Sequence, residues 1–209
     1  NVSTTATEVT VIADAPRLES ETSSLGNVVG QKKIEELPLN GRNFSQLAIL
    51  GAGTLPAPKS AERDSFVANG ARPVQNSYLL DGVENKNRIV GFDNGTAQSI
   101  QPVLDSIQEF KVQTGTYSAE FGQAAGGVVN VTMKSGSNNL HGSLFHFHRN
   151  SAISATPYFQ PVRGSKPQYL QNQFGATLGG PVLANRTFYF ASWQSSRELS
   201  AAPQVATVP

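Results

Sequence analysis

The last third of the sequence alternates between two kinds of side chain, and this pattern constrains the fold more than any other feature. Along residues 140–149, Phe145 and Phe147 fall on one face of an extended chain, while His146 and His148 fall on the other. Successive side chains of a β-strand point to opposite faces, whereas a helix repeats about every 3.6 residues. This part of the chain is therefore predicted to form β-strands.

Two further segments, residues 172–179 and 187–193, alternate in the same way after a predicted turn at residues 135–139. Strands of roughly 10 residues with one apolar and one polar or small face are typical of outer-membrane barrels. An antiparallel sheet in a soluble protein gives the same alternation, so periodicity alone leaves both open. Three strands do not close a barrel, and their edges need further strands to pair with.

Aromatic side chains are concentrated in this last third of the chain. In a complete barrel we expect them at lipid-facing and interfacial positions. They are Phe145, Phe147, Tyr158, Phe159, Phe174, Phe188, Tyr189, Phe190 and Trp193.

The preceding residues mix short helices with short strands, which is an α+β pattern. Residues 1–18 are predicted to be a linker with one short strand, Val9–Ala13. Residues 19–138 are predicted to form a small mixed sheet with short helices, and residues 139–209 antiparallel strands and loops. The elements expected within 19–138 are helices at 31–37, 44–50 and 103–106, and strands at 65–68, 77–80, 107–114 and 128–133.

Composition removes several classes of function. No apolar run approaches the roughly 20 residues of a membrane helix, so any membrane span has to be made of strands. The formal net charge is +1 and only 15% of the residues are charged, which argues against a nucleic-acid partner. The chain has no cysteine, so it forms no disulfide and no thiolate metal site.

No motif of a known catalytic class occurs in the sequence, and we predict a protein that is not an enzyme and needs no cofactor. His146 and His148 are two residues apart on one strand face, with His141 nearby, which makes a metal site geometrically possible. Side chains that face a lumen or solvent are the simpler interpretation, because no third ligand lies close in sequence. The acidic residues are scattered among turns, without the spacing of a general acid and base.

A series of short motifs follows one another between residues 37 and 131. In order, they are Leu37–Phe44 (LPLNGRNF), Asn69–Arg72 (NGAR), Tyr78–Val83 (YLLDGV), Ile107–Val112 (IQEFKV), Tyr117–Gly122 (YSAEFG) and Gly126–Val131 (GGVVNV). This order resembles the plug domain of TonB-dependent receptors, with the greatest similarity to the large Oar-like receptors of the outer membrane. The resemblance covers about residues 20–138, and the strands that follow resemble the start of the receptor barrel, with a turn at Gly179–Pro181.

The resemblance implies a plug folded inside a barrel of about 22 strands. In such a receptor the inner-membrane protein TonB opens the plug, and a bulky nutrient passes. It places the protein in the outer membrane of a bacterial cell envelope. A short extended segment ahead of the plug contacts TonB in this family, and Glu8, Val9, Thr10, Val11 and Ile12 resemble it loosely. The same segment is equally compatible with the last strand of a preceding sandwich domain.

The motif residues are interpreted first as architecture. Asp81–Gly82 and Asn40–Gly41 suit tight turns that need left-handed residues, and Gly126–Gly127 suits a close approach of two backbones. The candidate structural residues are Asn40, Gly41, Arg42, Asn69, Gly70, Arg72, Asp81, Gly82, Gly126 and Gly127. The loop at residues 83–96 is long enough to be functional, but its ligand is not predicted.

Two alternatives belong to other classes of protein. In the first, the chain between Asn1 and Pro209 is itself the product, a structural subunit. Its unpaired strands would join those of other copies in an oligomer or extracellular filament. In the second, the chain is a soluble binding or catalytic protein with an unrelated α+β fold. The pairing partners of the strands after Asn139 distinguish these alternatives from a receptor.

Overall fold

The computed structural model describes residues 24–58, 64–87, 96–122, 124–155 and 168–200. A five-stranded mixed sheet organises the part of the chain up to Met133. Its strands lie in the order β1-β6-β7-β4-β5, and all neighbours are antiparallel except β4 and β7, which are parallel. The strands are β1 (Leu25–Gly30), β4 (Ser77–Leu80), β5 (Val83–Glu84), β6 (Ile107–Gly115) and β7 (Val128–Met133).

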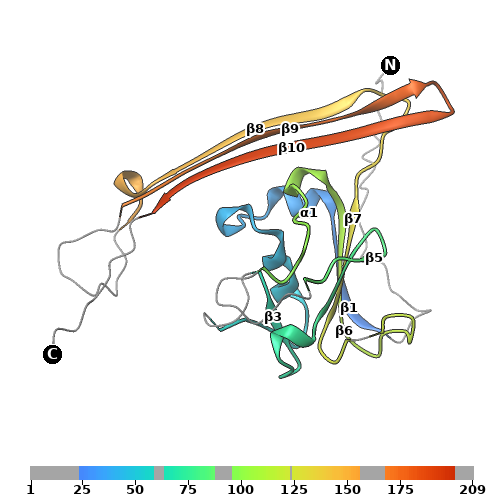
Figure 1. The fold of residues 1–209 in the computed structure, drawn as a ribbon, viewed down its shortest axis with the longest axis vertical. Helices are drawn as coiled ribbons and strands as arrows, with labels where there is room; N and C mark the ends of the chain where they lie inside the picture. The colour runs from blue at the N-terminus through green and yellow to red at the C-terminus, as the bar shows by residue number, and fades with distance from the viewer. Residues whose placement is uncertain (1–23, 59–63, 88–95, 123, 156–167, 201–209) are drawn as a thin grey trace, which may run out of the picture.

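Short helices and a two-stranded ribbon pack around this sheet (Figure 1). Helix α1 ends where Leu37 turns extended, because the residue before a proline disfavours helical dihedrals. Asn43 begins the next helix by accepting a hydrogen bond from the Ser45 N–H at 2.9 Å. These elements are α1 (Gln31–Glu36), the 3₁₀ turns η1 (Asn40–Arg42), η2 (Phe44–Leu50), η3 (Pro73–Gln75) and η4 (Leu104–Ser106), and the strands β2 (Thr54–Pro56) and β3 (Phe66–Ala68).

One apolar core lies between the sheet and the helices. Its largest members are fully buried, and Phe110 contacts Phe44 edge to face at 6.3 Å between ring centroids. The core residues are Val29, Ile34, Phe44, Leu47, Ala48, Phe66, Ala68, Tyr78, Ala97, Leu104, Ile107, Phe110, Val112, Val129 and Val131. We call this core-containing part, residues 24–133, the globule.

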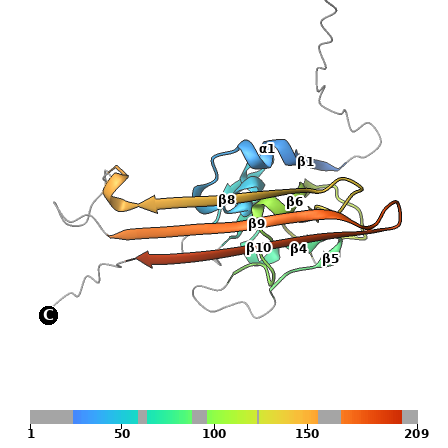
Figure 2. The same ribbon diagram turned by 90° about the horizontal axis from the view of Figure 1, so that it is seen from above.

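A separate three-stranded antiparallel sheet, which we call the wall, follows the globule. Its strands are β8 (His141–Asn150), β9 (Tyr169–Leu183) and β10 (Thr187–Ser200), in the order β10-β9-β8, and the short turn η5 (Ser151–Ile153) follows β8. Figures 1 and 2 show these strands as a long, gently curved ribbon that passes over one side of the globule. None of the helices in the described residues is long and apolar enough to cross a membrane.

The structure corrects several expectations. Residues 179–181 were predicted to form a turn, but they lie within β9, and the turn to β10 is at residues 184–186. The helix predicted at 44–50 is a 3₁₀ helix, and β1, β2 and β5 were not predicted. The strand predicted at Val9–Ala13 lies outside the described residues.

Candidate functional site

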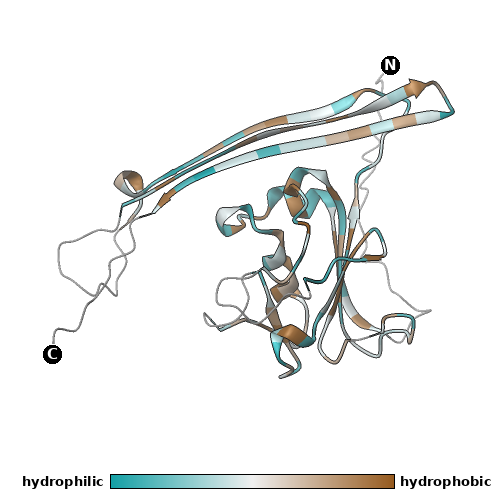
Figure 3. Ribbon diagram, viewed as in Figure 1, coloured by the Kyte–Doolittle hydropathy of each residue, from teal (hydrophilic) through white to brown (hydrophobic). Residues whose placement is uncertain are grey.

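The two faces of the wall differ in chemistry, as the alternating colours along its strands in Figure 3 show. The face turned away from the globule carries large apolar side chains with high exposed fractions, 88% for Leu144 and 59% for Trp193. The face turned toward the globule carries polar and small side chains, and Gln173 and Thr177 of β9 are buried there. An apolar outside and a polar inside are the pattern of a membrane barrel wall.

Three aromatic side chains lie on the inner side of the wall, contrary to the prediction that they face lipid. Phe145 and Phe147 reach the globule, where the Arg42 guanidinium lies over both rings. Phe190 lies beside an inner gap and stacks on His141 at 6.4 Å between ring centroids. Tyr158 and Phe159 lie outside the described residues.

Gly175 makes room for one of these rings. It pairs with Phe145 across strands β8 and β9. A Cβ atom built on Gly175 would lie 2.5 Å from the Phe145 ring and 2.4 Å from the Trp193 carbonyl oxygen. Any side chain at position 175 would therefore displace the ring or the neighbouring strand.

The turn η1 of the globule touches the inner face of the wall. Arg149 Nη1 donates to Asn40 Oδ1 at 2.8 Å, and Gln173 Nε2 donates to the Gly41 carbonyl at 3.2 Å. The Arg42 guanidinium carbon lies 4.7 Å from the Phe145 ring centroid and 4.1 Å from that of Phe147. Three consecutive residues thus each contact the wall.

The Arg42 side chain is also tied to the globule, through an ion pair with Asp105 of η4. The exposed fractions of the two side chains are only 15% and 17%. Burial lowers the pKa of the Arg42 guanidinium, and the negative charge of Asp105 acts in the opposite direction. Arginine remains charged in proteins, so this contact holds a partly buried cation between a carboxylate and two aromatic faces.

Away from η1, an open space lies between one part of the globule and the wall. A gap of about 650 Å³ separates α1 and β6 from the start of β8, and polar side chains provide most of its lining. On the globule side, Lys134 Nζ donates to Glu35 Oε1 at 2.9 Å. Partial burial acts to raise the pKa of Glu35, but hydrogen bonds from Lys134 and Gln31 outweigh it and the pKa is lowered. The interface is therefore polar away from η1.

The segment that joins the globule to the wall is held at the β9–β10 turn. Asn185 N donates to Asn138 Oδ1, and Asn138 Nδ2 donates to Asn185 Oδ1, both at 2.8 Å. A Cβ atom on Gly136 would lie 2.2 Å from the Tyr189 carbonyl oxygen, so this segment passes directly against β10.

The predicted structural residues other than those of η1 belong to the globule, several of them in exposed turns, and do not gather into one site. Asp81 (φ 50°) and Gly82 (φ 79°) form the left-handed turn between β4 and β5. Asp81 Oδ1 also accepts a hydrogen bond from the Met133 N–H at 2.9 Å. Asn69 and Gly70 form another left-handed turn, where Asn69 N donates to the Gly53 carbonyl at 2.8 Å.

Gly126 and Gly127 pass close to Asn76, a residue that the sequence analysis missed. Asn76 is fully buried, donates to the Phe66 carbonyl at 2.6 Å and accepts from the Gly127 N–H at 2.9 Å. A Cβ atom on Gly126 would lie 2.3 Å from Asn76 Oδ1. The only signal in the sequence was a polar residue immediately ahead of a predicted strand.

Arg72 is exposed and begins η3, where its N–H donates to Gln75 Oε1 at 2.9 Å. Residues 8–12, the predicted TonB-contacting segment, lie outside the described residues. Their role and the roles of the other predicted site residues remain predictions.

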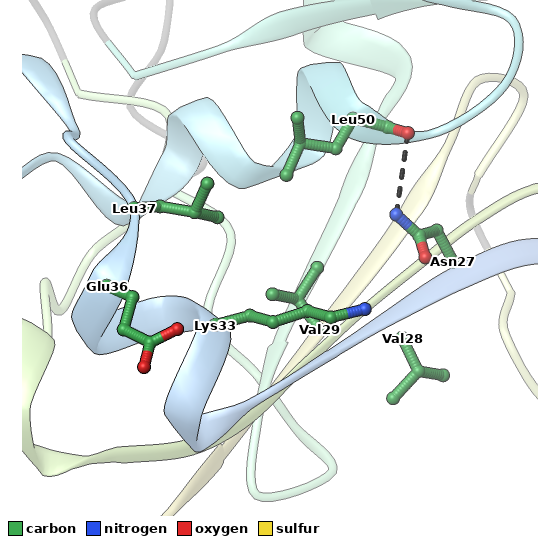
Figure 4. Close-up of a pocket in the computed structure, with 7 residues that line it drawn as sticks. All are labelled: Asn27, Val28, Val29, Lys33, Glu36, Leu37 and Leu50. Carbon is green, nitrogen blue, oxygen red and sulfur yellow. Dashed lines mark hydrogen bonds between the residues drawn. The ribbon is translucent and has the colours of Figure 1, made fainter. Parts of the chain in front are cut away.

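A shallow cleft of about 240 Å³ on the globule lies between β1, α1 and the end of η2 (Figure 4). Val29, Leu37 and Leu50 supply its apolar surface, and the long side chain of Lys33 extends across it. Asn27 Nδ2 donates to the Leu50 carbonyl at 3.4 Å at its edge. This arrangement offers apolar contact rather than acid–base chemistry.

The three histidines of β8 are engaged separately. His148 Nδ1 lies 2.8 Å from Asn172 Oδ1, and the His146 ring lies 6.5 Å from that of Phe174. In the described part of the chain, no three His, Asp or Glu residues are grouped closely enough to hold a metal ion.

A mixed sheet with a polar-faced wall beside it agrees with the comparison to known families. Residues 19–129 match the TonB-dependent Receptor Plug Domain, and residues 132–209 match an Outer membrane beta barrel domain. The chain belongs to the TonB-dependent receptor family. The globule is its plug, the wall is the start of its barrel, and the protein is located in the outer membrane.

A curated relative is the "TonB-dependent transporter Oar" of Myxococcus xanthus. It is 30% identical over 203 residues, which cover 90% of this chain and 18% of the relative. The chain thus spans about a fifth of that protein's length. The predicted resemblance to Oar-like receptors is confirmed.

Solved receptors share the fold. The siderophore receptor PirA of Acinetobacter baumannii is 21% identical with a TM-score of 0.63, and the match covers 83% of this chain and 24% of PirA. The outer membrane transporter YddB of Escherichia coli is 17% identical with a TM-score of 0.64, covering 83% and 26%. The predicted α+β plug followed by barrel strands is therefore confirmed, and none of these similarities supports a self-assembling subunit.

Proposed function

We propose that this chain is the plug and first barrel strands of a transporter that gates the uptake of a bulky nutrient and catalyses no reaction. The observation that carries the proposal is the position of the plug against the polar inner face of the wall, while the apolar face points away from it. A plug in this position obstructs the lumen. Passage therefore requires that the plug move or rearrange.

The energy for this movement is proposed to come from a TonB-type protein that binds residues 8–12. Val9 and Val11 alternate with polar residues, and such a peptide adds to the edge of a partner's sheet through its backbone. The remaining wall of the barrel is proposed to come from further strands, because β8 and β10 each have one unpaired edge within the described sheet.

A proline substitution tests the TonB contact. Val11→Pro in the full-length natural protein removes one backbone N–H and fixes φ, so it blocks strand addition without changing the plug. We expect site-specific cross-linking to TonB to be lost, together with energy-dependent uptake of the nutrient. Thr4→Pro, outside the proposed segment, is the matched control. Unchanged cross-linking in Val11→Pro would contradict the assignment of residues 8–12.

A further inference from the structure

We propose that the turn Asn40–Arg42 is a latch that fastens the plug to strand β8, and that Arg42 is its main residue. Displacement of the guanidinium from the rings of Phe145 and Phe147 would then be a required step when the plug opens. This inference rests on the proposed function, because it identifies the contact that must break during transport.

The backbone of the turn supports a functional role. Gly41 has φ 66° and Arg42 has φ 58°, so two consecutive residues are left-handed and one of them is not glycine. A left-handed arginine is disfavoured, and such strain persists only where the surroundings impose it. Gln46 braces the turn, accepting from the Asn40 N–H at 3.1 Å and donating to the Asn40 carbonyl at 2.9 Å. The strained turn presents Arg42 to the wall.

The contact is suited to break and re-form. Its side chains meet through charge, hydrogen bonds and ring faces rather than through a continuous apolar surface. Arg42 Nε is buried and donates to no acceptor among the described residues, so the cation is not fully satisfied in the closed state. The ion pair with Asp105 lies within the plug, so the guanidinium keeps its counter-charge when the plug leaves the wall.

The latch and the covalent connection between plug and wall lie toward opposite ends of β8. Short turns of a bacterial barrel face the periplasm, so the turn at 184–186 is periplasmic, and the far ends of β8 and β9, at Asn150 and Tyr169, face outward. The covalent connection and the Asn138–Asn185 pair hold the plug at the periplasmic end. The latch contacts β8 nearer its outer end, and the polar gap lies between the two attachments. Release of the whole turn Asn40–Arg42 would remove this outer contact and keep the attachment at the periplasmic end.

Conductance of the purified full-length protein in planar lipid bilayers, without TonB, tests the latch. We expect Arg42→Ala to raise the open fraction about tenfold, which corresponds to about 1.4 kcal/mol. The double variant Phe145→Leu/Phe147→Leu removes the ring faces and should raise it similarly. Phe147→Tyr keeps a ring and should remain closed, as should Arg186→Ala, which removes an exposed arginine from the periplasmic turn.

Combining the changes separates a latch from a general loss of stability. If Arg42 acts through the rings, Arg42→Ala added to Phe145→Leu/Phe147→Leu should open the channel no further than either change alone. If the combined variant instead has an open fraction raised by the product of the two separate factors, the proposal is overturned. A correctly inserted Arg42→Ala protein with the same open fraction as the wild type would also overturn it.

Two variants keep the test decisive if Arg42→Ala does not insert. Phe147→Leu and Phe147→Tyr change only the wall, and equal conductance of the two would also overturn the proposal. A reducible bifunctional thiol cross-linker that joins Asn40→Cys to Arg149→Cys should close the channel, and cleavage of the linker should raise the open fraction again. Because these measurements use no TonB, loss of TonB cross-linking in cells would affect the proposed function without affecting this result.

Discussion

The plug and the wall are both built around β-sheets, but they bury opposite kinds of side chain. In the plug, Phe66, Ile107 and Phe110 are buried in a self-contained apolar core. In the wall, Leu144 and Trp193 are exposed on the face turned away from the plug, and Gln171, Gln173 and Thr177 are buried on the face turned toward it. The plug thus carries its own solvent-excluded interior, whereas the wall depends on a lipid environment and on further strands. The two regions should respond differently to the same substitution.

A large-to-small change in the plug core is expected to have the greatest effect. Phe110 is completely buried and contacts Phe44, so Phe110→Ala should destabilise the plug by about 3–5 kcal/mol. Denaturant unfolding of the detergent-solubilised full-length protein, followed by plug proteolysis, measures this loss. Leu144→Ala on the exposed wall face is the control and should leave plug proteolysis unchanged.

A charge introduced on the outer face of the wall should destabilise the protein nearly as much as Phe110→Ala does. Trp193→Arg places a guanidinium in the apolar band and should destabilise insertion by about 2–4 kcal/mol if it lies near the bilayer midplane. Gln194→Arg, one residue away on the inner face, should have a much smaller effect. Folding into lipid vesicles, read from heat-modifiable migration, provides the comparison. Equal costs at both positions would show that the two faces are not distinguished by lipid.

Loss of a buried polar residue of the plug should destabilise the protein by a similar amount. Asn76→Ala leaves the Phe66 carbonyl and the Gly127 N–H without their partner, at a cost of about 1–3 kcal/mol for each unsatisfied group. The ends of β3 and β7 should therefore lose protection in hydrogen exchange. Gln75→Ala, on the neighbouring exposed residue, is the control.

The ion pair at the edge of the gap should matter least. Its Glu35 side chain is 44% exposed, so Lys134→Ala should cost no more than about 1 kcal/mol. Folding lowers the pKa of Glu35. The ion pair therefore stabilises the folded protein fully at pH values above the unfolded pKa of about 4.3. This stabilisation is lost as the pH falls through the lower pKa of the folded state. The difference between wild type and Lys134→Ala should therefore disappear in acid, as measured by unfolding between neutral pH and pH about 3. A difference that grows in acid would contradict this sign.

The period of two in residues 140–149 correctly separated the two faces of β8, but it did not tell which face meets lipid. Phe145 and Phe147 are apolar and were assigned outward, yet Arg42 binds their rings from inside. The structure brings Arg149 and Asn40 together although they are 109 residues apart in the sequence, and no local sequence pattern connects positions so distant. The latch was therefore beyond reach from a single sequence.

Strand ends were missed for physical reasons. Pro181 indicated a turn, but it lies past Gly179, the last residue of β9 with a β8 partner, so one side of the strand is an edge there and tolerates proline. Strand β1 contains glycine at both Gly26 and Gly30, which lowers its strand propensity. It is held instead by long-range pairing with β6. Strand β7 and the Asp81–Gly82 turn, where local propensity and tertiary structure agree, were predicted correctly.

The most direct test of this account is a cysteine scan along β10 in the full-length protein in lipid bilayers. These 209 residues contain no cysteine, so in a full-length protein with any cysteine elsewhere replaced, single substitutions at residues 191–196 can each carry a fluorescent label. We predict strong quenching by a lipid-soluble quencher at 191, 193 and 195, and weak quenching at 192, 194 and 196. Quenching that is uniform along the strand, or that alternates in the opposite phase, would contradict the account. In that account the wall is part of a barrel whose outer face meets lipid and whose inner face meets the plug.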